Sequence, residues 1–313
     1  MYENIVKEDF SHEGENNIWG FETSDTVPKY VESSLNWAVG GDTDSIMMTI
    51  PPAIITHLDS SEDEIVEFAD MIADLVNQSF PKFCMDVFNC PPERSDIIST
   101  AREVVSDKSF FLTKKRYIMH VINDEGDKVD KLKVMGVELI KSDTSNAIKT
   151  ILWEFVNLIL DGGSDKEILD LRQKTRDEWT ERWTFRDYAT PLNTKSLQKV
   201  INTLEATGSL KGAHYSARAA LFWNKMCTQV DKPISPGEKI GLIYIKHPES
   251  KYIGFPIDMM SVPEWCEDEI FIDYDVELKK AMEKVENYLE VLGLDIKTRK
   301  KSMAKSIFDF GYG

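Results

Sequence analysis

Cysteine is scarce in this sequence, with four residues in 313, and no two of them form a CxxC pair or accompany histidine at zinc-finger spacing. This pattern is typical of reduced, packing cysteines in a cytoplasmic protein. A long apolar run is also absent, since the most apolar stretch, residues 147–160, is interrupted by Lys149 and Glu154. Residues 1–20 are acidic and lack the apolar centre of a secretory signal. We therefore expect a soluble protein with no membrane span.

Positive charge is in short supply as well, because 37 Lys and Arg stand against 54 Asp and Glu, for a formal net charge of −17. Taken alone, this balance argues against nucleic-acid binding, which depends mainly on Lys and Arg that neutralise phosphates. A local basic track matters more than the total. One is present over residues 114–149, where eight basic residues outnumber six acids. Nucleic acid therefore stays open as a partner.

The rest of the composition is that of a globular protein of about two domains, with 42% hydrophobic and 10% aromatic residues. We expect a sheet-and-helix domain over residues 35–147 and a mainly helical domain over 148–313, so the predicted fold class is α+β. Residues 1–34 stand apart, with eight acids, two lysines and no clear apolar period. We interpret them as an extension or docking segment, with partial disorder as the alternative.

Local patterns predict the main elements. Residues 35–50 have the pattern of a β-hairpin, with two glycines and two aspartates at its turn. A helix with acids in its first turn is expected to begin near residue 60, and strands are expected at about 109–112, 116–122 and 131–139. Further along, apolar spacing predicts a helix from Ser145, a strand-like insert over 239–258, and helices over 164–184, 194–207, 214–230 and 274–292.

The pentapeptide GDTDS, residues 41–45, carries the most chemistry. Residues i and i+2 near a strand end point to the same face, so Asp42 and Asp44 could both project from the tip of the hairpin. Two carboxylates so close repel each other unless a divalent cation compensates them, and oxygen ligands suit Mg²⁺. Spacing alone leaves an Asp-rich surface turn as the alternative.

Together with the sequence around it, GDTDS resembles motif C of the family B DNA polymerases, especially those of T4-like phages, although Gly40 departs from the usual residue before it. Residues 114–117 match the family's KKRY element, and Arg102-Glu103 resembles the RE segment that precedes KKRY. Residues 131–144 resemble the family's K-x-K-x-x-G-x-E and K-S-x-T stretch. A slightly shifted form of the thumb pattern KG-x-x-x-H-x-R-x-x-x-x-x-N is found at Lys211, Gly212, His214, Arg218 and Asn224.

The resemblance implies part of a palm followed by a thumb, which add dNTPs to a primer 3′-hydroxyl by two-metal phosphoryl transfer. It makes Asp44 the firmer Mg²⁺ ligand, Asp42 an assisting carboxylate and Glu103 an acid near the two ions. It assigns the binding of primer–template DNA to Lys114, Lys115, Arg116, Tyr117, Lys131, Lys133, Lys141, His214 and Arg218.

The C-terminal segment, residues 300–310, resembles the clamp-binding tail of T4-like polymerases. The resemblance implies that Ile307, Phe308 and Phe310 enter a groove on a sliding clamp. A tail that folds back on the thumb is the alternative.

Several parts of the family pattern are not found in the sequence. These are the motif A aspartate (D-x-x-S-L-Y-P), the motif B helix (K-x-x-x-N-S-x-Y-G) and the exonuclease domain. We therefore expect the C-terminal subunit of a split polymerase, whose N-terminal partner chain carries these parts, with residues 1–34 at the junction. A phage origin and action in the host bacterial cytoplasm follow from the resemblance. The alternatives are a non-catalytic fragment that binds DNA and the clamp, and a divalent-metal hydrolase that uses the D-x-D turn.

Overall fold

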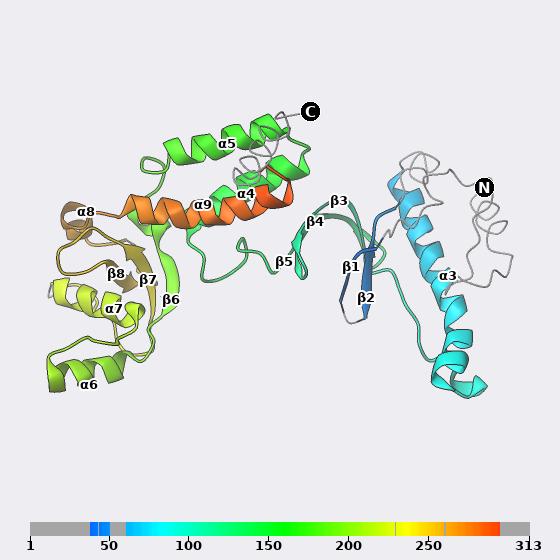
Figure 1. Cartoon of the computed structure of the whole chain (residues 1–313), viewed down its shortest axis with the longest axis horizontal. Helices are drawn as coiled ribbons and strands as arrows, with labels where there is room; N and C mark the ends of the chain where they lie inside the picture. The colour runs from blue at the N-terminus through cyan, green and yellow to red at the C-terminus, as the bar shows by residue number, and fades with distance from the viewer. Residues whose placement is uncertain (1–37, 43, 51–60, 229, 260, 295–313) are drawn as a thin grey trace, which may run out of the picture. The chain divides into compact units, whose positions relative to one another are not determined.

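The computed structural model describes residues 38–42, 44–50, 61–228, 230–259 and 261–294. Helices and small sheets alternate along the chain, which confirms the predicted α+β class (Figure 1). The described residues fall into two compact units: the first comprises those up to Asp107 together with Val121–Lys131, and the second comprises Lys108–His120 together with those from Leu132 on. The palm and thumb boundaries that the resemblance implies stay predictions.

The first unit contains the predicted hairpin and a long helix. β1 (Ala38–Asp42) pairs antiparallel with β2 (Ser45–Met48), and Asp42 lies opposite Ser45. The hairpin prediction is thus confirmed for its described residues. α3 (Glu62–Phe88) follows, with three acids in its first turn as expected, where they stabilise the partial positive charge of the helix start. The helix ends at Asn89, whose left-handed backbone closes it, and a short 3₁₀ turn, η1 (Pro92–Arg94), comes next.

A three-stranded sheet follows in the order β3 (Val104–Thr113), β4 (Arg116–Asp124), β5 (Asp127–Met135). The central strand is the most apolar, and Ile118 and Val121 on it are completely buried. Two-residue turns join the strands, and each requires left-handed backbone, with φ of 61° at Lys115 and 104° at Gly126. The three strands correspond to the predicted strand segments, and the KKRY element lies at the first turn.

Helices make up much of the second unit. α4 (Asn146–Leu160) begins directly after Ser145, as predicted, and packs against α5 (Asp165–Asp177) and α9 (Tyr274–Val291) (Figure 1). Ser164 and Glu167 form a capping box at the start of α5. α5 is shorter than predicted, and the 3₁₀ turn η2 (Phe185–Tyr188) follows it.

The second unit also contains a sheet of its own, in the order β6 (Thr190–Asn193), β7 (Lys239–Tyr244), β8 (Tyr252–Pro256). α6 (Leu197–Thr207) leads to α7 (Tyr215–Met226), which packs on β7 and β8, and α8 (Glu264–Glu269) precedes α9. Strands β7 and β8 confirm the predicted insert. β6 was not predicted, because TPLN is short and its proline lacks the backbone N–H that would donate a hydrogen bond in a sheet.

α9 is tied to this sheet by a buried carboxylate. The side chain of Glu277, a residue that is 1% exposed, accepts a hydrogen bond from the backbone N–H of Tyr244 at 3.0 Å. It also forms an ion pair with Lys280 at 2.8 Å. A buried charge is tolerated only with such partners. Helices in the described ranges all lack the combination of length and apolarity that a membrane span requires.

Candidate functional site

The hairpin presents both aspartates of GDTDS at one tip. Asp42 is the last residue of β1, and Asp44 lies in the turn just before β2, with an exposed side chain. The turn is tight, because a Cβ added at Gly41 would lie 3.3 Å from the carbonyl oxygen of Ser45. Glycine at this position therefore lets the two strands approach at the point where the acids are.

The flanks of this hairpin expose apolar side chains. The exposed fraction is 73% for Ile46 and 55% for Met48 on β2, and 45% for Val39 on β1. In the described part of the chain these two strands form a sheet by themselves. A two-stranded hairpin is marginally stable at best in water, so this one needs further structure to pack against.

The exposed carboxylate of Asp44 at the hairpin tip is of a kind that suits a hard divalent cation. Carboxylate oxygens are the ligands that Mg²⁺ prefers. Across the described residues, however, no three His, Cys, Asp or Glu side chains are grouped so that they could hold a metal ion. The side chain of Asp42 lies outside the described part of the structure, so both aspartates stay predicted ligands.

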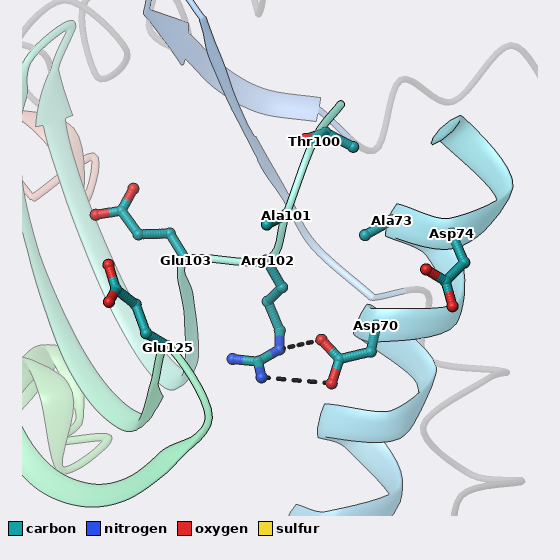
Figure 2. Close-up of a pocket in the computed structure, with 8 residues that line it drawn as sticks. All are labelled: Asp70, Ala73, Asp74, Thr100, Ala101, Arg102, Glu103 and Glu125. Carbon is teal, nitrogen blue, oxygen red and sulfur yellow. Dashed lines mark hydrogen bonds and ion pairs between the residues drawn. The ribbon is translucent and has the colours of Figure 1, made fainter. Parts of the chain in front are cut away.

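A pocket of about 500 Å³ lies in the first unit, between α3 and the start of β3 (Figure 2). The guanidinium of Arg102 donates to the carboxylate of Asp70 at 2.5 Å and to the side-chain oxygen of Asn123 at 2.6 Å. Figure 2 shows the Glu103 and Glu125 side chains next to each other, on the side of the pocket away from α3. The backbone N–H of Glu125 donates to the carbonyl of Glu103 at 2.8 Å, which explains this arrangement.

The RE segment therefore combines two different environments. Arg102 fastens α3 to the sheet, whereas Glu103 is exposed beside Glu125. The sequence predicts a role for Glu103, but it does not predict the neighbouring Glu125 or the Asp70 partner of Arg102. Glu125 looked like part of an ordinary turn, and nothing in the local pattern distinguishes Asp70 from the other acids of α3.

The KKRY element forms the turn from β3 to β4, with Lys114 and Lys115 exposed at its tip. Gly136, at the end of β5, packs against this turn: a Cβ there would lie 2.3 Å from the carbonyl oxygen of Lys115 and 3.2 Å from Cγ of Arg116. The backbone of Gly136 also has a φ of 63°, which favours glycine. Two motifs that are separate in the sequence are thus one structural unit.

Arg116 points to a buried acid rather than outward. Its guanidinium donates to Glu138 at 2.5 Å, and Glu138 is only 7% exposed. Two lysines approach the same carboxylate, Lys141 at 3.5 Å and Lys284 at 3.6 Å. Burial raises the pKa of Glu138, but a backbone hydrogen bond and the three cations outweigh burial and hold the pKa below its usual value. Glu138 is therefore ionised at neutral pH.

The other DNA-binding candidates lie in varied surroundings. Tyr117 is half-buried, with its ring 5.7 Å from that of Phe111. Lys131 forms an ion pair with Asp124, and Lys133 is half-buried on the same strand. Lys114, Lys115, Arg116 and Lys141 are thus the candidates that gather around the KKRY turn.

The thumb pattern builds a loop before α7. His214 is the N-cap residue of α7, and its imidazole accepts the backbone N–H of Ser216. Arg218 donates to the carbonyl oxygens of Leu210 and Ala213, at 2.9 and 3.1 Å. These contacts shape the loop that carries exposed Lys211. Asn224 of α7 holds the segment after that helix in the same way, because its side-chain amide donates one hydrogen bond to the backbone of Ile234 and accepts another from it.

The proposed clamp-binding residues Ile307, Phe308 and Phe310 lie outside the described residues, as does the segment 1–34.

No curated protein matches the chain. The model of a family described as DNA polymerase family B matches residues 5–292, a range that includes the GDTDS hairpin, the KKRY turn, the thumb pattern and most of the segment 1–34. This chain therefore belongs to DNA polymerase family B, a family of DNA-directed nucleotidyltransferases.

Proposed function

We propose that this chain is the C-terminal, palm-and-thumb subunit of a split DNA polymerase of a T4-like phage, and that it acts in the cytoplasm of the host bacterium. Family membership implies primer–template DNA and dNTPs as substrates, and Mg²⁺ as the ion that such enzymes generally use. The partner is a chain that supplies motifs A and B and the exonuclease domain.

The observation that carries this proposal is the incomplete state of the GDTDS hairpin. Its two strands expose Val39, Ile46 and Met48, and among the described residues no three His, Cys, Asp or Glu side chains are grouped so that they could hold a metal ion. A palm segment from a partner would remedy both, by covering the apolar side chains and by adding the aspartate of motif A. Neither motif A nor motif B is found in the sequence.

In the assembled enzyme, Asp44 would be the firmer metal ligand of this chain, and Asp42 would assist. Bound Mg²⁺ would supply charge stabilisation for phosphoryl transfer. Glu103 would act near this centre without direct coordination, through the orientation of water or neighbouring groups. The task of the hairpin is to hold the two carboxylates at one tip before substrate arrives.

The basic residues would position the DNA. Lys114 and Lys115 at the tip of the KKRY turn suit the phosphates of the primer strand, while Tyr117 supports the turn from within. Lys131 and Lys133 would extend this track along β5. In the thumb loop, His214 and Arg218 would act mainly by shaping the loop, because their hydrogen bonds are made to its own backbone. The tail with Ile307, Phe308 and Phe310 would bind a sliding clamp.

Primer extension tests the split. The purified 313-residue chain, given a labelled primer–template, Mg²⁺ and dNTPs, should not extend the primer, and addition of the N-terminal chain should restore extension. The N-terminal chain alone serves as the control. Robust synthesis by this chain alone would contradict the split, and DNA binding without extension in the mixture would favour a non-catalytic fragment.

A further inference from the structure

Glu138 joins three separate parts of the second unit through one carboxylate. Arg116 comes from the start of β4, Lys141 from the loop after β5, and Lys284 from α9. Lys284 lies outside the family motifs described above. Three cations around one anion leave a formal surplus of two positive charges at this point.

The acid lies beneath its partners. The exposed fraction of the Glu138 side chain is 9%, against 27% for Arg116, 44% for Lys141 and 41% for Lys284. An anion that approaches from solvent therefore meets the cations rather than the carboxylate. The two lysines lie 3.5 and 3.6 Å from the carboxylate, too far for a strong hydrogen bond, so their ammonium groups keep donors for another acceptor.

The packing under the cluster keeps α9 in place beside the KKRY turn. Tyr288, one helical turn after Lys284, is 1% exposed and stacks on Phe110 of β3, with the ring centres 5.6 Å apart. The Nε atom of Arg116 and the hydroxyl of Tyr288 are buried without a hydrogen-bond partner among the described residues. Glu138 is thus the group that orients the Arg116 guanidinium.

We propose that Glu138 is a positioning residue, which holds Arg116, Lys141 and Lys284 together so that all three bind one stretch of the phosphate backbone of DNA. The inference rests on the DNA-binding part of the proposed function. It adds Lys284 of α9 to the proposed DNA-binding surface. It also assigns a positioning role to Glu138, the buried acid of the G-x-E segment. Without the carboxylate, the three cations would repel one another and separate.

Salt-dependent DNA binding tests the part played by Lys284. The probe is a fluorescein-labelled primer–template duplex, and its anisotropy with the full chain is measured over a series of salt concentrations. Lys284→Gln should make the slope of log affinity against log salt shallower by about one, because one fewer counterion is released. The matched control is Lys279→Gln, which removes the same charge from an exposed position on the same helix and should change little.

Glu138→Gln tests positioning against simple charge balance. If Glu138 were only a counter-charge, its removal would strengthen DNA binding. Positioning predicts the opposite, a loss of about threefold or more, and a smaller effect of Lys284→Gln in this background than in the wild type. Thermal unfolding of each variant checks the fold. If Glu138→Gln does not fold, the comparison of Lys284→Gln with Lys279→Gln decides alone.

The outcomes separate this inference from the proposed function. A wild-type chain that does not bind the duplex at low salt would overturn both. If the wild type binds and Lys284→Gln behaves like Lys279→Gln, or if Glu138→Gln binds more tightly, the inference alone is wrong.

Discussion

At the scale of single residues, the KKRY element divides into parts with different surroundings. Lys114 and Lys115 are exposed at the tip of the turn, whereas Arg116 faces the buried carboxylate of Glu138. The sequence presents all three as one basic run. The first two extend into solvent at the tip, whereas the third is held by Glu138 beside Lys141 and Lys284.

Asp44 provides the sharpest test at this scale. In the reconstituted enzyme, Asp44→Ala should lower the rate of primer extension by several orders of magnitude, because it removes the proposed metal ligand, which would be needed in the transition state. Single-turnover extension measures the rate, and duplex anisotropy should show little change in DNA affinity. Asp42→Ala should cost less. Near-normal extension by Asp44→Ala would mean that the GDTDS turn is structural.

At the scale of elements, the end of β5 and the turn from β3 to β4 depend on each other. Lys115 and Gly136 both have positive φ, and their backbones approach so closely that a side chain at Gly136 would collide with the Lys115 carbonyl. The G-x-E segment therefore supports the KKRY turn in two ways, through the space left by Gly136 and through the charge of Glu138.

Gly136→Ala should disturb this contact. We expect a loss of roughly 2–4 kcal/mol in the free energy of unfolding, from the positive φ and the overlap with Lys115 together, and weaker duplex binding. Denaturant unfolding measures the first effect and anisotropy the second. Gly162→Ala is the matched control, since Gly162 has a φ of 76° but no atom within 4 Å of an added Cβ. It should lose only about 1–2 kcal/mol. Equal losses would show that the contact with Lys115 is unimportant.

At the scale of the whole molecule, a chain with a net charge of −17 still gathers cations at one turn. Most surface charges interact weakly across more than a Debye length, about 8 Å in physiological salt, so the proposed contact with phosphate depends on the local cluster. Net charge is therefore a poor guide to whether this polymerase chain binds DNA.

At the same scale, the proposed clamp-binding role of the C-terminal segment can be tested by deletion. Deletion of residues 306–313 should leave short, distributive synthesis intact in the reconstituted enzyme and should abolish stimulation by the sliding clamp on long templates. The apolar residues Ile307, Phe308 and Phe310 supply the gain from burial in a clamp groove, at roughly 1.5–3 kcal/mol for each large side chain. Product length with and without clamp is the measurement. Deletion of residues 311–313 alone should retain stimulation, and equal stimulation of all three chains would refute the assignment.

Local patterns predicted much of the fold. The hairpin, the strands around KKRY, α4 and α9 were predicted because their turns and apolar spacing are properties of a few neighbouring residues. β6 and α8 were missed because each is too short to show a period. At the site, the motifs identified Glu103, Arg116 and the G-x-E segment that contains Glu138, but they did not predict that Glu125 lies beside Glu103 or that Glu138 pairs with Arg116.

The sequence by itself determined the α+β class, the acidic hairpin tip and, through its motifs, the polymerase family, because these depend on residue type and short-range spacing. Only the tertiary structure decided which charges meet. Arg116, Glu138 and Lys284 are far apart along the chain, and their pairing follows from how α9 packs beside the turn from β3 to β4. A carboxylate binds whichever cations the packing brings within reach, and no local pattern of residues encodes that distance.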